Sequence, residues 1–295
     1  MKVCVTGAAG FVGRHVCKAL TGAGHDVIGL DVCPRSNMDQ EWITADITQT
    51  LLPIWGLDAV IHLAAVAHPR ECEADHARTF AVNVNGTYHV LQMALESGAK
   101  KFVFASTAHV YGISPKYLPT SESHPLGTPL WRQHTYSRTK ILGEQLCKRY
   151  YENDGLSCTI LRLYNAYGSG QGRGYFIPDM LEMARRGRIE LTGGSTTKDF
   201  VYVEDVARAF VLAIEAPFGG ALTLNIGTGR ESRLEDVASA IAMHLEVPYS
   251  DTGDEYRQTR MRADISRAGE QLGWKPQVSL EEGIRAVVDG ATAKV

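Results

Sequence analysis

A tyrosine and a lysine stand four residues apart in the segment YSRTK, at Tyr136 and Lys140. On a helix, residues i and i+4 lie on one face, so the phenol and the ammonium would be neighbours. A free phenol has a pKa of about 10, and a nearby positive charge favours the phenolate and lowers that pKa. The pair is therefore suited to take a proton from a substrate hydroxyl and to return it. By itself, this spacing is more often a surface pair on a helix.

A glycine-rich turn lies near the N-terminus, between a predicted strand and a predicted helix. Its sequence is TGAAGFVG (6–13), in which glycines recur at every third position. In such a turn Gly7 permits the tight bend, Gly10 lets the backbone approach a pyrophosphate, and Gly13 allows close packing of helix on sheet. The helix that follows directs its unpaired N–H groups and its positive dipole end at the phosphates. We expect this turn to bind NAD through Gly7, Gly10, Phe11, Val12 and Gly13.

An acidic residue completes the pattern of a dinucleotide site. Asp31 ends the second predicted strand, where a carboxylate accepts hydrogen bonds from the adenosine ribose hydroxyls and repels a 2′-phosphate. The pattern therefore favours NAD over NADP, although Arg14 and Arg35 lie close in sequence and would offset part of that repulsion. Asp46 and Ile47 are expected to border the adenine; the alternative for Asp46 is a helix N-cap.

These motifs belong to an alternation of short apolar runs and amphipathic stretches. Strands are predicted at 3–5, 26–30, 59–63, 101–105 and 158–163, and helices at 11–21, 77–95 and 136–150. Strands that alternate with helices form a parallel sheet covered on both faces. The predicted fold class is α/β, with a doubly wound Rossmann sheet.

The pattern loosens after residue 165. Helices are predicted at 176–186, 205–215 and 234–245, and residues 246–263 are expected to be irregular. Residues 223–226 could return to the main sheet. We therefore expect an NAD-binding domain over residues 1–165. A smaller α/β substrate domain would occupy residues 166–295, with segments that return to the first sheet.

The composition is that of an ordinary globular protein. The 295 residues are 44% apolar and 21% charged, and the net charge of −3 gives no basic footprint for nucleic acid or an anionic membrane. The six cysteines form no C-x-x-C pair and show no zinc-ligand spacing, so no metal is expected. No apolar run is long enough to cross a bilayer, and no signal region precedes the first strand. We expect a cytoplasmic protein with neither a nucleic-acid nor a membrane partner.

A series of short motifs carries a resemblance to a known family along nearly the whole chain. After TGAAGFVG come HLAA (62–65), NVNGT (83–87), STAHVYG (106–112), YSRTK (136–140), RLYN (162–165), DFVYVEDV (199–206), NIGTG (225–229) and LGWKP (272–276). In this order they resemble the extended short-chain dehydrogenases/reductases, specifically the NAD-dependent epimerase/dehydratase family.

The resemblance implies three catalytic residues. Tyr136 would be the acid/base, Lys140 would hold the nicotinamide ribose and tune Tyr136, and Thr107 would hydrogen-bond the reacting oxygen. The alternative for Thr107 is a hydroxyl that caps local backbone. The motifs also imply that NAD is contacted by Leu63, Ala64, Ala65, Asn83, Ser106 and Tyr164.

The two residues after Thr107 bear on the type of reaction. Dehydratases and decarboxylating members of the family often have acidic residues there, whereas this chain has Ala108 and His109. Ala108 cannot move a proton; His109 could, since its ordinary pKa lies near neutrality, and its alternative is a packing histidine. The segment resembles sugar-nucleotide 4-epimerases more than 4,6-dehydratases.

The resemblance implies a nucleoside diphosphate sugar as substrate. His109 and Asn165 would lie near the sugar or the diphosphate. The nucleotide base would be walled by Phe176, Ile177 and Leu191.

Lys198 stands where relatives often have an arginine, and a lysine lacks the bidentate fork of a guanidinium. We expect Arg257 to supply the missing phosphate contact, with Arg260 and Arg262 as alternatives. All three could instead form a solvated basic surface.

Together these features imply an NAD-dependent nucleotide-sugar epimerase that oxidises its substrate transiently at C4 and returns the hydride to the other face. The alternative is an NAD(P)H-dependent 4-keto-sugar reductase or a dehydratase on the same scaffold. A non-catalytic dinucleotide sensor does not need the pair of Tyr136 and Lys140. An enzyme acting on a small alcohol does not need the sugar-nucleotide pattern of the second half. The resemblance further suggests a homodimer formed through helices near residues 77–97 and 134–153.

Overall fold

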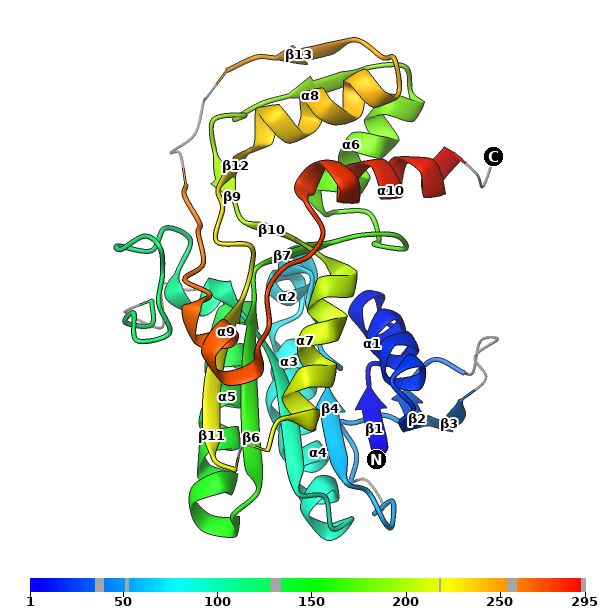
Figure 1. The fold of residues 1–295 in the computed structure, drawn as a ribbon, viewed down its shortest axis with the longest axis vertical. Helices are drawn as coiled ribbons and strands as arrows, with labels where there is room; N and C mark the ends of the chain where they lie inside the picture. The colour runs from blue at the N-terminus through cyan, green and yellow to red at the C-terminus, as the bar shows by residue number, and fades with distance from the viewer. Residues whose placement is uncertain (35–39, 51–52, 128–133, 218, 254–258, 293–295) are drawn as a thin grey trace.

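A parallel sheet of seven strands forms the centre of the computed structural model, which describes residues 1–34, 40–50, 53–127, 134–217, 219–253 and 259–292. The strand order is β11-β6-β5-β4-β1-β2-β3 (Figure 1). The strands are β1 (Lys2–Thr6), β2 (Asp26–Asp31), β3 (Glu41–Thr44), β4 (Ala59–His62), β5 (Lys101–Thr107), β6 (Ser157–Leu163) and β11 (Ala221–Ile226). The predicted α/β class with a doubly wound Rossmann sheet is confirmed.

The chain enters the sheet at β1, and the direction in which strands are added reverses between β1 and β4. It runs from β1 outward to β2 and β3, then crosses back to β4 on the other side of β1. In open α/β sheets, ligands bind beyond the carboxyl ends of the strands at such a reversal. The ends of β1 and β4 therefore mark the expected ligand side.

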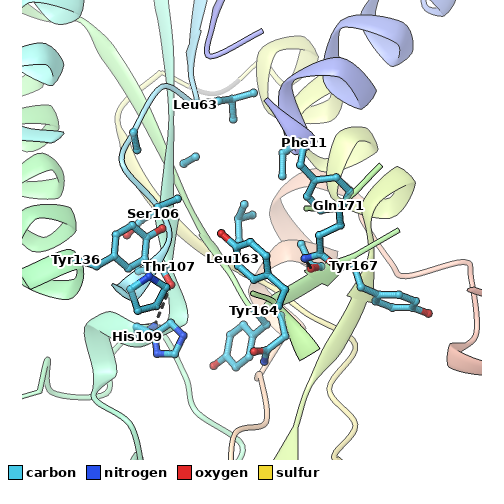
Figure 2. A pocket seen from close by; sticks show the side chains of 18 of the residues that line it. Phe11, Leu63, Ser106, Thr107, His109, Tyr136, Leu163, Tyr164, Tyr167 and Gln171 are labelled. Carbon is cyan, nitrogen blue, oxygen red and sulfur yellow. Dashed lines mark hydrogen bonds between the residues drawn. The ribbon is translucent and has the colours of Figure 1, made fainter. Parts of the chain in front are cut away.

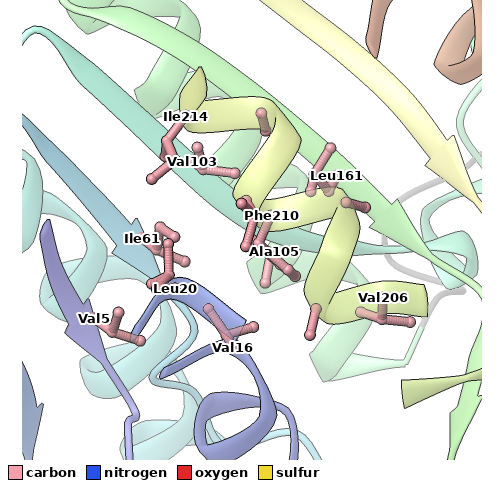
Figure 3. Close-up of a cluster of buried hydrophobic side chains, with 14 of the residues drawn as sticks. Val5, Val16, Leu20, Ile61, Val103, Ala105, Leu161, Val206, Phe210 and Ile214 are labelled. Carbon is pink, nitrogen blue, oxygen red and sulfur yellow. The ribbon is translucent and has the colours of Figure 1, made fainter. Parts of the chain in front are cut away.

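One face of the sheet is covered by α1 (Phe11–Gly22), α7 (Val203–Glu215) and α9 (Ser266–Leu272). Figure 3 shows the core of this face, with Val16 and Leu20 of α1 and Phe210 of α7 packed on strand residues. Phe210 has no exposed surface, and complete burial of such a side chain contributes roughly 1.5–3 kcal/mol. Apolar burial on alternate strand residues thus fixes α1, whose N-terminus carries the glycine turn.

The other face is covered by α4 (Gly86–Glu96) and α5 (Thr135–Asp154). Gly143 lets α5 approach the sheet, because a Cβ at this position would lie 3.1 Å from Cε1 of Phe104 and closer still to Cζ. The helices α2 (Pro69–Ala74) and α3 (His76–Phe80) also precede α4 on this side. The predicted helix at 136–150 is confirmed, and it carries Tyr136 and Lys140.

The helical stretch predicted at 77–95 has an irregular turn in its middle. Between α3 and α4 the chain forms a π-helical turn over Ala81–Asn85, labelled η1. Such a turn inserts one residue and is frequent at functional sites. Here it buries Asn83, whose role is described below.

A second group of helices and strands, here called the second layer, lies beyond the carboxyl ends of the sheet strands (Figure 1). The seven-stranded sheet and the helices that cover its two faces are called the first layer. Its core contains α6 (Phe176–Arg185), α8 (Leu234–His244) and α10 (Leu280–Thr292). Its strands pair in twos: β7 (Asn165–Tyr167) with β10 (Phe200–Tyr202), β8 (Ile189–Leu191) with β13 (Tyr249–Asp251), and β9 (Thr197–Lys198) with β12 (Ser232–Arg233).

Several segments after residue 165 do return to the first layer. β11 pairs in parallel with β6, and α7 packs on the same core as α1. Residues 246–263, expected to be irregular, contain the short strand β13. None of the described helices is both long and apolar enough to cross a membrane.

Candidate active site

A cavity of about 350 Å³ opens where the carboxyl ends of the central strands meet the second layer (Figure 2). Its walls come from both layers, including the first turn of α1, the loop after β4, the end of β5, α5, and the start of α6. The predicted site residues that line it are Phe11, Val12, Leu63, Ala65, Ser106, Thr107, His109, Tyr136, Lys140, Tyr164, Asn165, Phe176 and Ile177. Residues from segments far apart in the sequence are therefore brought together in one chamber.

Lys140 lies on the sheet side of this cavity and is 3% exposed. Its Nζ donates to the carbonyl oxygen of Ala105 at 2.8 Å and lies 4.8 Å from the centre of the Phe104 ring. The same Nζ is 5.9 Å from the centre of the Tyr136 ring. Burial lowers the pKa of Lys140 to about 8.

Tyr136 departs from the expectation that Lys140 lowers its pKa. Burial raises the pKa of the phenol, the nearby Tyr175 and Cys72 raise it further, and a hydrogen bond with Thr107 lowers it only in part. The ammonium of Lys140 is directed at a backbone carbonyl, so loss of water outweighs its attraction for a phenolate. With its pKa raised, Tyr136 is a neutral acid at pH 7.

Thr107 is the last residue of β5 and faces the cavity beside Tyr136 (Figure 2). It is 5% exposed, and its Oγ1 accepts the backbone N–H of His109 at 3.2 Å. The local cap considered as an alternative is therefore present. Because the hydroxyl still carries its own proton, it can donate to an oxygen in the cavity.

Ser106, the neighbour of Thr107, is hydrogen-bonded to a buried ion pair on the side away from the cavity. Its hydroxyl donates to Glu144 Oε1 at 2.6 Å. Glu144 also accepts from Arg162 Nε at 2.9 Å and Nη2 at 2.7 Å, and Arg162 Nη1 donates to Tyr111 Oη at 2.9 Å. This network ties the end of β5 to α5 and β6. The sequence reasoning missed Glu144, whose one signal is its place a helical turn after Lys140.

The glycine turn fits a bound diphosphate. Gly7 has φ of +71°, and a Cβ there would lie 2.6 Å from the backbone nitrogen of Ala64. A Cβ on Gly13 would overlap the carbonyl group of Gly7. The N-terminus of α1 at Gly10 has no side-chain cap and no acidic residue in its first turn, so its N–H groups are open to an anion.

The residues expected around the adenosine do not line the cavity. Asp31 ends β2, and its carboxylate accepts the backbone N–H groups of Ala9 and Cys33, each at 3.0 Å. Asp46 accepts the N–H of Thr48 at 2.8 Å in a local turn, and Ile47 is buried. Asp31 thus braces the glycine turn from the side on which a ribose would lie.

Asn83 holds the loop after β4 rather than lining the cavity. Its side chain accepts the N–H of Val66 at 2.8 Å and donates to the Val66 carbonyl at 3.0 Å. It also donates to Thr139 Oγ1 at 3.0 Å, next to Lys140. Ala64, in the same loop, donates its N–H to Thr6 Oγ1 at 3.3 Å.

His109 lines the cavity, whereas Lys198 does not line it but lies near enough to affect the pKa of His109. Burial lowers the pKa of His109 to about 4, with the charges of Lys198 and His134 adding to the effect. The imidazole is therefore neutral at pH 7 and does not serve as a general acid at that pH. Burial also lowers the pKa of Lys198, whose Nζ contacts Met261 Sδ at 3.8 Å.

Other predicted substrate residues lie apart from the cavity. Leu191 is buried in the core of the second layer. Arg260 forms a bidentate ion pair with Glu231, and Arg257 and Arg35 lie outside the described residues. The sequence reasoning also missed Tyr175 and Gln171, which line the cavity from the loop before α6. Only their place near the glycine-rich segment at 168–174 signals them.

The chemistry that this cavity supports is removal and return of a proton at an oxygen. A neutral phenol and a hydroxyl face one space, a buried ammonium lies behind the phenol, and an uncapped helix N-terminus opens at the other end. Among the residues that line the described cavity there is no Asp or Glu.

Comparisons with known proteins agree with this geometry. The sequence model of the NAD dependent epimerase/dehydratase family matches residues 3–227. The UDP-glucose 4-epimerase of Mycolicibacterium smegmatis is 34% identical over 315 residues, covering 98% of each chain.

Solved structures agree over the whole chain. The structure of MoeE5 in complex with UDP-glucuronic acid and NAD has a TM-score of 0.89 at 27% identity and covers 100% of both chains. The UDP-glucose 4-epimerase of Thermotoga maritima with UDP-glucose has a TM-score of 0.88 at 29% identity and covers 100% of this chain and 99% of that one. The chain therefore belongs to the NAD-dependent epimerase/dehydratase family and is an NAD-dependent enzyme of the extended short-chain dehydrogenase/reductase type.

Proposed function

We propose that this enzyme is a nucleotide-sugar 4-epimerase that keeps its NAD bound through the reaction. The observation that carries the proposal is the cavity itself, where Tyr136 and Thr107 face one space that no acidic side chain of the described lining enters. A dehydratase needs further proton transfers, and Ala108 and the neutral His109 do not supply them. Transient oxidation of one hydroxyl, with NAD as the hydride acceptor, needs no side chains for proton transfer beyond the phenol of Tyr136 and the hydroxyl of Thr107.

In the proposed mechanism, Tyr136 exchanges a proton with the sugar oxygen at C4 while Thr107 donates a hydrogen bond to that oxygen. NAD, held by the residues named in the next paragraph, would supply the hydride acceptor and donor at C4. Lys140 Nζ lies 5.9 Å from the centre of the Tyr136 ring, and its positive charge favours the ionised phenol against the opposing effect of burial. The flat 4-keto sugar turns over between the two transfers, so that the same Tyr136 serves both directions.

The residues proposed to hold NAD are those of the glycine turn, with Asp31 for the adenosine ribose and Lys140 for the nicotinamide ribose. The N-terminus of α1 supplies open N–H groups for the diphosphate. We propose that residues 1–165, completed by β11 and α7, form the NAD-binding part. Residues of the second layer would then hold the sugar nucleotide.

The proposed substrate is a UDP-hexose. Relatives and solved structures that cover nearly the whole chain carry UDP-sugars or UDP-glucose in their names. Asn165, Phe176 and Ile177 line the second-layer side of the cavity, where sugar and nucleotide would lie. Lys198 is the cation proposed to face the diphosphate: it does not line the cavity itself, but its charge acts on the cavity residue His109, and no carboxylate among the described residues forms an ion pair with it.

The test is incubation with UDP-glucose and, separately, UDP-galactose, without added NAD, followed by ¹H NMR of the anomeric region. An epimerase brings both substrates to the same equilibrium mixture. The Tyr136→Phe variant, which keeps the ring and loses the hydroxyl, is the control. A reductase would instead consume NADH stoichiometrically with a 4-keto sugar nucleotide and leave UDP-hexoses unchanged, which would refute the proposal.

We further propose a homodimer formed through α4 and α5. These helices expose apolar side chains that a monomer would leave in water, with Tyr88 45%, Leu142 38% and Tyr151 37% exposed. Tyr88 packs edge-on against Tyr150 with ring centres 6.4 Å apart, so its position is fixed. Light scattering with size exclusion should give twice the chain mass, and Tyr88→Glu should halve it; a wild-type monomer contradicts the proposal.

A further inference from the structure

The loop at 168–174, with the sequence GSGQGRG, joins β7 to α6 and borders the cavity. Gln171 and Gly174 belong to the cavity lining, as does Tyr175 directly after the loop. Figure 2 shows Gln171 next to Phe11, on the side of the cavity opposite Tyr136 and Thr107. The loop therefore lies at the end of the cavity formed by the first turn of α1.

Three side chains from the first layer donate hydrogen bonds to backbone carbonyls of this loop. Arg14 Nη2 donates to Gly170 O at 3.0 Å, and His15 Nε2 donates to Ser169 O at 3.0 Å. His68, just before α2, donates from Nε2 to Gly174 O at 3.1 Å. Because a carbonyl only accepts, both imidazoles carry their proton on Nε2.

Two glycines in the loop allow these contacts. Gly170 has φ of +83°, and a Cβ there would lie 3.1 Å from Arg14 Nη2. Gly174 has φ of +88°, and a Cβ there would overlap the imidazole of His68. A glycine-rich loop has much conformational freedom of its own, so its position depends on the side chains that hold it.

The two histidine donors also contact aromatic residues of the proposed site, His15 at the N-terminus of α1 and His68 on the side of Tyr136. His15 packs on Phe11 with ring centres 5.8 Å apart, at the helix N-terminus proposed for the diphosphate. His68 packs edge-on against Tyr175 with ring centres 5.4 Å apart, and Tyr175 in turn lies close enough to Tyr136 to raise its pKa. Holding the loop thus also fixes a second phenol beside the acid/base.

We propose that Arg14, His15 and His68 are positioning residues that hold loop 168–174 as a strap over the end of the cavity formed by the first turn of α1 and thereby retain NAD between the two hydride transfers. The inference rests on the proposed function, because an epimerase must return the hydride from the same cofactor molecule that accepted it. A strap made of backbone held by side chains of the other layer meets that need. It contributes no atom to the chemistry.

The test uses the double variant His15→Phe/His68→Phe, which keeps both ring contacts and removes both donors. Arg173→Ala is the matched control, because Arg173 belongs to the same loop but pairs with Glu182 of α6 at 2.9 Å. The first readout is deuterium uptake of the amides of residues 168–174 without cofactor. The second is the rate at which bound NADH leaves, followed by its fluorescence after a chase with excess NAD.

Loss of two hydrogen bonds is expected to speed NADH release about thirtyfold, or about 2 kcal/mol at roughly 1.4 kcal/mol per factor of ten. Deuterium uptake by the loop should rise as well, while Arg173→Ala releases NADH within about twofold of the wild type. If the double variant fails to fold, each single variant, with an expected effect of about fivefold, replaces it.

An unchanged release rate, or loop amides that exchange as in the wild type, would overturn the strap. A wild type that fails to epimerise UDP-hexoses while the variant releases NADH faster would refute the proposed function and leave the strap in place. The two failures are thus separated, because one is read from turnover and the other from cofactor release.

Discussion

Removing the charge of Glu144 is expected to destabilise this enzyme by about 3–5 kcal/mol, the usual cost of leaving one partner of a buried ion pair alone. The side chain of Glu144 is 0% exposed and that of its partner Arg162 is 4% exposed, so water cannot replace the lost contact. In Glu144→Gln the shape is kept, but the guanidinium of Arg162 stays buried without its counter-ion.

The hydrogen bonds that Glu144 accepts lead to a similar estimate of the lost free energy of unfolding. Its carboxylate accepts hydrogen bonds from Ser106 Oγ, Arg162 Nε and Arg162 Nη2 at 2.6–2.9 Å. Hydrogen bonds to a charged group contribute about 1.5–3 kcal/mol each, and the glutamine retains one acceptor oxygen for part of them. A loss of about two such bonds gives about 3–6 kcal/mol, which overlaps the range expected for the broken pair.

The assay is urea unfolding at pH 7, followed by circular dichroism. Glu144→Gln and Arg162→Met should each lose about 3–5 kcal/mol, whereas the double variant Glu144→Leu/Arg162→Met should lie within about 1–2 kcal/mol of the wild type, because neither charge of the pair is left buried without its partner. Arg285→Met is the control, since Arg285 pairs with Glu281 on the surface and should cost less than about 1 kcal/mol.

The result that would refute this reasoning is a cost below about 1 kcal/mol for Glu144→Gln, equal to that of the surface control. The pair would then be as weak as an exposed one. A double variant as unstable as the sum of the single variants would also contradict it, because the two side chains would then act independently.

Three further predictions concern the site. Tyr136→Phe should lower kcat by about 10²–10⁴ and leave the Kd for NAD within about threefold, as measured by turnover and titration calorimetry; equal turnover would exclude Tyr136 as the acid/base. Because burial lowers the pKa of Lys140 to about 8 while the unfolded value is about 10.5, the free energy of unfolding should rise between these pH values by up to about 1.4 kcal/mol per pH unit. Lys140→Met should remove this rise in urea titrations at pH 7–10, and an unchanged slope would contradict the assignment. Gly13→Ala should abolish NAD binding, because its Cβ overlaps the Gly7 carbonyl, whereas Gly22→Ala meets nothing within 4 Å and should stabilise α1 by about 0.5–1 kcal/mol; equal effects in thermal unfolding and NAD titration would refute the steric argument.

Much of the sheet and of its first helices could be predicted from the sequence, because local patterns decide them. The strand, glycine turn and helix at residues 3–21 follow from apolar runs and from the spacing of Gly7, Gly10 and Gly13. The helix that carries Tyr136, predicted at 136–150, is long and spans Thr135–Asp154. Residues 223–226, which the sequence allows to return to the sheet, pair in parallel with β6.

The rest depends on contacts between distant segments, which no local pattern carries. The π-helical turn at Ala81–Asn85 exists because Asn83 reaches Val66 and Thr139, far from it in sequence. The raised pKa of Tyr136 follows from how much water the fold removes, and spacing from Lys140 does not report that. Likewise, no spacing rule joins Glu144 to Arg162 or His68 to Gly174.

The position of β11 at one end of the sheet has a consequence for how the protein is made. While a ribosome has released only the first 220 residues, β6 has no neighbour on its outer side, because its partner Ala221–Ile226 has not yet emerged. A long apolar strand with an unpaired backbone is a template for joining another chain. The nascent enzyme therefore passes through a period in which the outer edge of β6 is unpaired, and mutations that slow the docking of β11 should lower the soluble yield more than they lower the stability of the finished protein.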